Sequence, residues 1–353
     1  MPERVLDRRA LNRALLARQH LLHRAELPVA GMLEHLGGMQ AQEPQAPFVG
    51  LWSRIRAFDP HELDGLLERR EAVRLLLMRG TVHLVTARDC LAFRAMVAES
   101  LRKRVTGVVR ARLDGIGLDE IARLAAPMIE AEPLQSPEVG RRLRAALGAG
   151  EPQPLGWAAT GVVPAVQLPP RGLWGRTGPA LLTTAQRWLG AELAAETAPD
   201  ALVLRHLAAF GPATTSDIRM WSGVTGVREA VARLRPRLVS HADERGRELL
   251  DLPGMPLPDP DTPAPVRFLP EFDNAFLAHA DRTRIIADEH KPLIVAGTRF
   301  FLVDGFAAGT WRVEDGVVRT EPFGAQAREH AEALAAEGER LTTFLASARA
   351  RGG

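Results

Sequence analysis

The clearest pattern of apolar and polar positions lies in residues 200–252. Apolar residues recur there at helical spacing until Gly211-Pro212, which ends the pattern. Thr214 and Asp217 then form a capping box that opens a second helix, and a third helix follows a Ser-Gly turn. Two short apolar runs separated by a polar turn complete the segment. Three helices followed by a two-stranded hairpin is the order of a winged helix.

Two other stretches repeat this order. Near the N-terminus, helices are predicted at 8–24, 28–37, 44–56 and 60–69, and two strands follow at 73–78 and 81–85. The middle of the chain repeats the order more faintly. Helices are predicted at 89–112, 118–131, 137–147 and 157–163, and a hairpin-like stretch follows at 168–175. After a proline-rich connector at 253–265, strands and a final helix at 325–348 predict an additional sheet.

We therefore predict an α+β, mainly α chain built from three tandem winged-helix domains. Their predicted bounds are residues 1–88, 89–195 and 196–353, and the last domain carries the additional sheet and the final helix. A length of 353 residues agrees with two or three domains.

Composition narrows the class of protein and its compartment. The chain has no apolar run long enough for a transmembrane helix, and its first nine residues lack the apolar stretch of a signal peptide. The single cysteine, Cys90, excludes an internal disulfide and is expected to be a small buried apolar residue. We therefore expect a cytoplasmic protein.

Arginine supplies almost all of the positive charge, because Lys103 and Lys291 are the only lysines in a chain of net charge +2. A GC-rich genome would also favour arginine, so the number alone does not prove nucleic-acid binding. The arginines gather in clusters, which comprise Arg4, Arg8, Arg9, Arg13, Arg18, Arg24, Arg102, Arg104, Arg110, Arg112, Arg141, Arg142 and Arg144. Such clusters either contact a phosphate backbone or are solvated helix faces.

The sequence lacks the familiar catalytic signatures, among them the P-loop, G-x-S-x-G, H-E-x-x-H and C-x-x-C. The histidines show no metal-ligand spacing, and His83 is expected in the core because it lies between apolar residues of a predicted strand. No metal or cofactor is therefore expected.

Two polar segments could carry chemistry. In the first, a helix ends at Gly37-Gly38, and an extended stretch presents Gln40 and Gln42 on one face. The two amides could hold one water by donation and acceptance, although the residues alone favour a polar loop that caps neighbouring helices. The second segment, residues 271–274 with 279–282, is either a turn held by Asp and Asn side chains or a polar loop that meets DNA.

A series of short motifs occurs in order along the chain. They are Leu11-Asn12-Arg13, Met39-Gln40-Ala41-Gln42, Gly50-Leu51-Trp52-Ser53-Arg54, Met78-Arg79-Gly80-Thr81-Val82-His83, Phe210-Gly211-Pro212-Ala213, Trp221-Ser222-Gly223, Leu269-Pro270-Glu271-Phe272-Asp273-Asn274, His279-Ala280-Asp281-Arg282 and Gly309-Thr310-Trp311. Taken together, and over essentially the whole chain, they resemble the winged-helix bacterial DNA glycosylases of the AlkZ and YcaQ type.

This resemblance implies a C-shaped arrangement with double-stranded DNA in the concave face. The family's catalytic motif is a glutamine, one residue, and a second glutamine or an aspartate, and it falls on Gln40 and Gln42. The residues then expected to bind DNA are Arg9, Arg13, Arg79, His279, Asp281 and Arg282. The resemblance further implies a monomer without cofactor that excises bulky N7-alkylguanine adducts or unhooks interstrand crosslinks, with self-resistance to a DNA-alkylating natural product as a possible role.

Two amides fit that chemistry. Alkylation at N7 places a positive charge on guanine, so the base departs neutral and needs no general acid. The remaining tasks are to position a water and to stabilise an oxocarbenium-like sugar, which oriented dipoles can do. Because a neutral pair stabilises a cation less than a carboxylate would, undamaged bases are not expected to be substrates. The role of Glu43, directly after the motif, is left open.

The alternative is a winged-helix transcription regulator without enzymatic activity. Arg228 and Arg233 would then enter a major groove. Three such units in one chain argue against it, because a regulator usually dimerises on a palindromic site. A purely partner-binding role for the arginine clusters has no positive feature in its favour.

Overall fold

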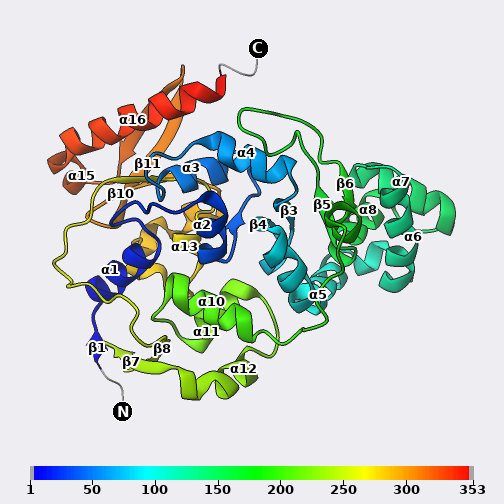
Figure 1. The fold of residues 1–353 in the computed structure, drawn as a ribbon, viewed down its shortest axis with the longest axis horizontal. Helices are drawn as coiled ribbons and strands as arrows, with labels where there is room; N and C mark the ends of the chain where they lie inside the picture. The colour runs from blue at the N-terminus through cyan, green and yellow to red at the C-terminus, as the bar shows by residue number, and fades with distance from the viewer. Residues whose placement is uncertain (1–3, 350–353) are drawn as a thin grey trace.

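The computed structural model describes residues 4–349 (Figure 1). Residues 1–3 of the first predicted domain and residues 350–353 of the last lie outside the described residues. Helices predominate over strands, so the prediction of an α+β, mainly α chain is confirmed. Within the described part, no helix combines the length and the apolar character that a membrane span requires.

The N-terminal part follows the predicted order of helices ahead of a strand pair. Its elements are β1 (Val5–Leu6), α1 (Arg8–Arg18), α2 (Val29–Leu36), β2 (Met39–Gln40), α3 (Ala46–Trp52), α4 (Pro60–Glu68), β3 (Ala72–Leu76), η1 (Met78–Gly80) and β4 (Val82–Thr86). The first helix ends at Arg18 rather than at residue 24, because His20 takes a left-handed backbone conformation with φ 53°. Leu21 and Leu22, which continued the apolar pattern, are buried in the core.

The middle part is a group of helices followed by two short strands. Its elements are α5 (Ala87–Val109), η2 (Arg110–Arg112), α6 (Leu118–Ala131), α7 (Ser136–Leu147), α8 (Pro152–Val162), β5 (Ala165–Gln167), β6 (Leu182–Thr184) and α9 (Ala185–Leu189). α8 starts earlier than predicted, because its prolines occupy the first turn, where the missing N–H is tolerated. The predicted hairpin at 168–175 is wrong: these residues form the loop between β5 and β6.

The third part has the elements predicted for residues 200–252. They are α10 (Asp200–Phe210), α11 (Thr215–Ser222), α12 (Val227–Leu234), η3 (Arg235–Arg237), β7 (Val239–Asp243) and β8 (Glu248–Asp251). The predicted capping box is present, with Thr214 and Asp217 each accepting from the other's backbone N–H. The left-handed Gly223 then ends α11, which allows the tight turn into α12.

The C-terminal part carries the additional sheet that the sequence predicts. Its elements are β9 (Arg267–Leu269), α13 (Asn274–Leu277), η4 (Arg282–Arg284), η5 (Asp288–His290), α14 (Lys291–Val295), β10 (Phe300–Val303), β11 (Phe306–Glu314), β12 (Val317–Pro322), α15 (Ala325–Glu329) and α16 (Ala331–Arg349). The antiparallel strand order is β12-β11-β10-β9.

Two sheets connect parts of the chain that the sequence assigned to different domains. A five-stranded sheet of order β2-β4-β3-β5-β6 joins strands on both sides of the predicted boundary at residues 88 and 89. In a three-stranded sheet, β1 runs parallel to β7 and extends the β7-β8 hairpin of the third part. The division into three winged-helix domains stays a prediction.

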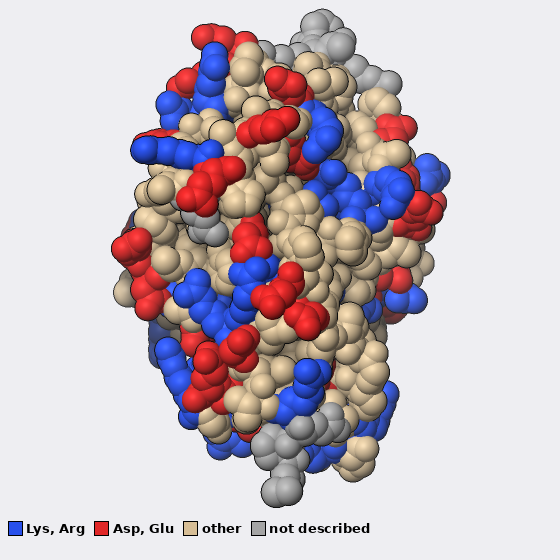
Figure 2. Space-filling view, turned by 90° about the vertical axis from the view of Figure 1, so that its left-hand side faces the viewer, with Lys and Arg blue, Asp and Glu red and all other residues tan. Residues whose placement is uncertain are grey.

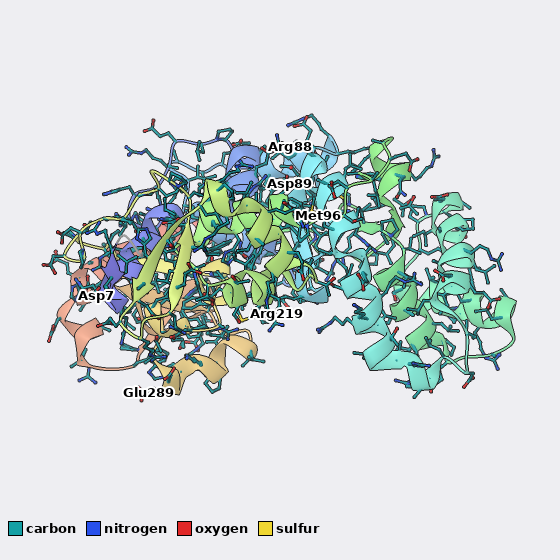
Figure 3. All side chains as sticks on the ribbon, turned by 90° about the horizontal axis from the view of Figure 1, so that it is seen from below. Asp7, Arg88, Asp89, Met96, Arg219 and Glu289 are labelled. Carbon is teal, nitrogen blue, oxygen red and sulfur yellow. The ribbon has the colours of Figure 1, made fainter. Side chains whose placement is uncertain are left out.

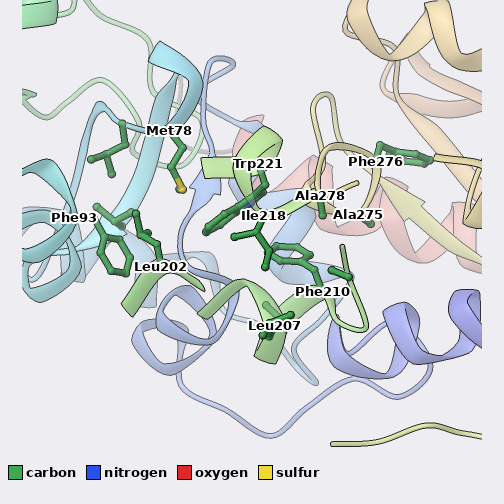
Figure 4. Packing of buried hydrophobic residues seen from close by; sticks show 14 of the residues in the cluster. Met78, Phe93, Leu202, Leu207, Phe210, Ile218, Trp221, Ala275, Phe276 and Ala278 are labelled. Carbon is green, nitrogen blue, oxygen red and sulfur yellow. The ribbon is translucent and has the colours of Figure 1, made fainter. Parts of the chain in front are cut away.

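The largest apolar core lies where the third part packs on the strands and the long helix of the other parts (Figure 4). Trp221 stands at its centre, with its ring 5.6 Å from that of Phe210. Met78 and Phe93 meet this cluster from η1 and α5, and Cys90 is buried in it, as predicted. This core fixes η1 against the end of α11.

The molecule has an arched outline when it is seen from below (Figure 3). The helices α5 to α8 form one side of the arch, and the remaining elements form the larger side. Arg219, on α11, lies where the larger side borders the opening. This outline agrees with the C shape that the resemblance implies.

Candidate active site

Gln40 lies on β2, an edge strand of the five-stranded sheet, where it pairs with His83 of β4. The pairing continues for one residue, because the N–H of Ala41 donates to the carbonyl of Val82 at 2.7 Å. Two left-handed glycines bring the chain from α2 into this strand. At the second, Gly38, any Cβ would collide with Val85, so the helix can end this close to β4 only with glycine.

Asn274 binds the outer edge of β2. Its Nδ2 donates to the carbonyl of Gly38 at 2.7 Å, and its Oδ1 accepts from the N–H of Gln40 at 3.4 Å. An edge strand otherwise leaves such groups unpaired. The side chain of Asn274 therefore takes the place of a neighbouring strand.

A buried ion pair holds Asn274 in position. Asp273 accepts two hydrogen bonds from Arg54, at 2.7 and 2.8 Å, and both side chains are fully buried. Asp273 also caps α13 through the N–H of Ala275, and Arg54 donates to Gln19. Residues 271–274 thus form the turn held by Asp and Asn side chains that was one of the two interpretations of this segment.

The backbone of the motif is held from the inner side as well. Arg74 of β3 donates to the carbonyl of Ala41 at 2.9 Å. Arg74 is buried, and this burial lowers its pKa to about 10. Residues 40 and 41 are therefore fixed by groups from three separate segments of the chain, which are β3, β4 and the turn at Asn274.

The two glutamine side chains are each bound through the carbonyl oxygen. Gln40 is 8% exposed, and its Oε1 accepts from Arg79 Nη2 at 3.0 Å. Gln42 is exposed, and its Oε1 accepts from the N–H of Val82 at 3.3 Å. The sequence predicted that the two amides hold one water between them. A water that donates to either carbonyl oxygen would have to compete with the hydrogen bond from Arg79 or from Val82.

Two of the residues expected to bind DNA lie in the interior instead. Arg13 has no exposed side chain and donates to Asn12, Thr262 and Asp304. His279 is 2% exposed, and its Nε2 contacts the carbonyl of Phe210 at 3.0 Å. Burial is inconsistent with direct contact to DNA, so these two predictions are corrected to structural roles.

The other four predicted DNA-binding residues are partly exposed. Arg9 is neutralised by Asp304, and Asp281 by Arg245 and Arg247. Arg79 lies at the motif itself and donates to Gln40 and to the carbonyl of Trp221. Within residues 4–349, the side chain of Arg282 has no hydrogen-bond or ion-pair partner, and its positive charge acts on Arg79. Arg282 alone of the four thus keeps an unneutralised charge beside the motif without binding it.

The arginines of the first helix are used mainly inside the protein. Arg18 forms a fully buried pair with Asp251, and Arg24 pairs with the buried Glu337. On the face shown in Figure 2, which includes α1, basic and acidic side chains of the described residues are interspersed. The cluster in and around α1 therefore does not form a phosphate-binding stripe.

Glu43 follows the motif directly and is exposed. It lines a cavity of about 400 Å³ together with Arg171, Arg176 and Arg299. Its charge reaches the buried Arg74, whose pKa it helps to raise against the effect of burial. In the structure, Glu43 thus belongs to the polar surroundings of the Ala41 carbonyl.

Two buried histidines, one of them paired with Gln40, make stability depend on pH. Burial lowers the pKa of His83 to about 3 and that of His206 to about 4. In the unfolded chain both would bind protons near pH 6.5. Their contribution to stability is therefore complete above about pH 6.5 and is lost as the pH falls toward 4.

We expect the free energy of unfolding to fall by roughly 1–2 kcal/mol for each of these histidines between about pH 7 and about pH 5. Urea unfolding at the two pH values measures this loss. The variant His83→Phe should show a shallower dependence than the natural chain. Equal stability of the natural chain at both pH values would contradict the prediction.

Among the described residues, no group of three or more His, Cys, Asp or Glu side chains is placed to hold a metal ion. The residues that sequence reasoning missed are those that hold the motif, chiefly Asn274, Arg54 and Arg74. Asn274 lay in a segment that the sequence marked as unusual. Arg54 stands in one of the ordered motifs but had no assigned role, and Arg74 had no sequence signal; the partners of both lie far away along the chain.

Comparisons with known proteins agree with this fold. A family model described as "DNA glycosylase AlkZ-like" matches residues 33–344. Among solved structures, the chain is similar to "Streptomyces sahachiroi DNA glycosylase AlkZ", with a TM-score of 0.72 and 20% sequence identity over 90% of this chain and 91% of that one. At that identity the likeness shows the fold alone. No match was found among curated protein sequences.

The family model spans most of the chain and includes the Gln40-Ala41-Gln42 motif. It names the same family as the ordered motifs of the sequence. The chain belongs to the AlkZ-like DNA glycosylase family, and it is therefore a DNA glycosylase.

Proposed function

We propose that this glycosylase hydrolyses the N-glycosidic bond of N7-alkylguanine, including bulky adducts and interstrand crosslinks, and leaves an abasic site. The observation that carries the proposal is the placement of Gln40 and Gln42 at a rigidly held sheet edge, with Gln42 exposed. An exposed site of this kind suits a bulky adduct better than a closed pocket, which would have to enclose it.

The charge on the alkylated base explains why amides suffice. The bond to a cationic purine breaks without prior protonation, so the site needs no general acid. Gln40 and Gln42 are neutral at every physiological pH and supply oriented dipoles. Normal bases, which do need help to leave, are therefore outside the proposed substrate range.

The two lysines support a hydrolytic reaction without strand cleavage. A lyase step would need an amine near the sugar to form a Schiff base. Lys103 pairs with Glu99 on α5, and Lys291 pairs with Asp288 near α14. Neither lysine contacts the motif, so we propose a monofunctional glycosylase.

The proposed activity is tested with the purified full chain and a duplex that carries one N7-methylguanine. Alkali-labile abasic sites should appear at the modified position and not in the undamaged duplex. A panel of N7 adducts of increasing bulk, with a crosslinked duplex, then defines the substrate. If the chain binds each of these duplexes but releases no base, the proposed activity is wrong.

Arginines without acidic partners are the proposed contacts to the DNA backbone. Within residues 4–349 no hydrogen bond or ion pair engages the side chains of Arg104, Arg219, Arg228 or Arg282. Arg104 lies over Gly80, next to Arg79, and Arg219 borders the opening of the arch (Figure 3). The four arginines lie on α5, α11, α12 and η4.

Binding is expected to weaken steeply with salt. About four arginine–phosphate contacts predict a loss of about 100-fold in affinity between about 50 mM and about 200 mM salt. Fluorescence anisotropy with an undamaged duplex measures this slope, and Arg219→Ala should reduce it by about one contact. An affinity that does not change with salt would exclude this surface.

The remaining features of the proposal concern its setting. We propose a cytoplasmic enzyme that acts as a monomer on double-stranded DNA and needs no cofactor. A role in self-resistance would follow if the chain protected cells against a DNA-alkylating natural product. Expression in a sensitive host, with survival compared across several alkylating agents, tests that role.

A further inference from the structure

One arginine and one strand N–H determine how the two glutamine side chains are turned. A guanidinium and a backbone N–H can donate a hydrogen bond but cannot accept one. Arg79 donates to Gln40 Oε1, and the N–H of Val82 donates to Gln42 Oε1. Both carbonyl oxygens therefore face these donors, which turns both NH₂ groups away from them.

The open hydrogen-bonding capacity of the motif is mainly that of a donor. Each carbonyl oxygen keeps a second lone pair, but no acceptor within residues 4–349 binds the Nε2 of Gln40 or of Gln42. The pair thus presents N–H groups, and acceptor atoms of a ligand are what it can bind.

Arg79 is held in an arrangement that costs free energy. Its backbone is left-handed, with φ 57°, although it is not a glycine. Its guanidinium is largely buried, and burial together with the positive charge of Arg282 lowers the pKa of Arg79 to about 10. No carboxylate in the described part of the chain pairs with it. Such strain persists where the surrounding structure imposes it, and it clusters at functional sites.

We propose that Arg79 is a positioning residue, which fixes the amide of Gln40 so that the motif donates hydrogen bonds to acceptor atoms of the departing purine. The inference rests on the proposed function. The carbonyl of Trp221 is the second anchor of the Arg79 guanidinium, so the orientation of Gln40 is tied to the end of α11.

The reaction explains what the donors achieve. When the C1′–N9 bond breaks, its electron pair moves onto the base and neutralises the charge of the alkylated ring. Electron density at acceptor atoms such as N3 and O6 rises at the same time. Water then adds its oxygen to C1′ and releases one proton to solvent. Donors aimed at those atoms bind the transition state more tightly than the ground state.

The variant Gln40→Glu removes the side-chain N–H donors of residue 40 and keeps an acceptor oxygen. A carboxylate accepts from Arg79 as well as the amide does, so the fold and its Tm should be kept. It has no N–H to offer, so the single-turnover excision rate at saturating enzyme should fall by at least about 100-fold. Excision at the natural rate would overturn the assignment. Activity of the natural chain on the same duplex is established first, so a failure of the proposed function is recognised separately.

A double-mutant cycle tests the role of Arg79. Arg79→Met should slow excision by about 100-fold in the natural chain and by nothing further in a Gln40→Ala background, because the two residues act as a unit. If the two substitutions slow excision additively, Arg79 does not act through Gln40, and the proposal is overturned. The matched control is Arg70→Met, since Arg70 is also left-handed, with φ 64°, and also donates to a tryptophan carbonyl, that of Trp188. That variant should excise at the natural rate.

Discussion

The variant Gln42→Ala is expected to excise N7-methylguanine about 100-fold more slowly than the natural chain while binding DNA with unchanged affinity. Gln42 is exposed, and within residues 4–349 its side chain makes a single hydrogen bond, to the N–H of Val82. Water can replace that bond, so the fold should not change. The loss therefore reports on contacts made with the reacting nucleotide.

Single-turnover kinetics at saturating enzyme measure the effect, with affinity determined separately by anisotropy. The matched control is Gln135→Ala, because Gln135 is also exposed and its side chain makes no capping bond to α7. Gln135 lies in the middle part, away from the motif. Equal excision rates for Gln42→Ala and the natural chain would remove Gln42 from the site.

The second large effect is expected on stability. Asp273→Ala should lower the free energy of unfolding by about 3–5 kcal/mol, because it leaves the fully buried Arg54 without its partner. The cap of α13 is lost as well, and Asn274 loses its support next to Gln40. Urea unfolding measures the loss.

A surface ion pair supplies the control for that experiment. Arg112 and Glu151 are each about half exposed, and their attraction is screened by solvent. Glu151→Ala should therefore leave the unfolding midpoint unchanged. If Asp273→Ala unfolds at the midpoint of the natural chain, the buried pair does not support the site in the way described.

The sequence predicted the elements better than it predicted their contacts. The capping box of Thr214 and Asp217 and the helix at 118–131 are local features, and the structure has both as predicted. The hairpin predicted within 168–175 failed, because this proline- and glycine-rich stretch is itself a loop, and the strands that pair across it, β5 and β6, lie on either side of it. Periodicity also placed the end of the first helix too late, since it cannot register the left-handed turn at His20.

The same limit applies to the candidate site. Arg13 and His279 carry the residue types that DNA-binding surfaces use, yet tertiary packing buries both. Arg79 and Gln40 are distant in sequence, and only the pairing of β2 with β4 brings them together. A sequence motif can therefore indicate candidate residues, while the groups that orient their side chains become visible only in the fold.

The five-stranded sheet limits how the protein can adapt to DNA. Its ladder of hydrogen bonds runs without interruption from Gln40 on β2 to Thr184 on β6. Rotation of the middle part about the junction at residues 88 and 89 would shear the pairing of β3 with β5 and would displace the strands that align Gln40. The turn between α6 and α7 is tied to the same sheet, because Leu134 exchanges two backbone hydrogen bonds with Leu182 of β6. We therefore expect the strand that carries Gln40 and the helices attached to β6 to move as one body when the protein meets DNA.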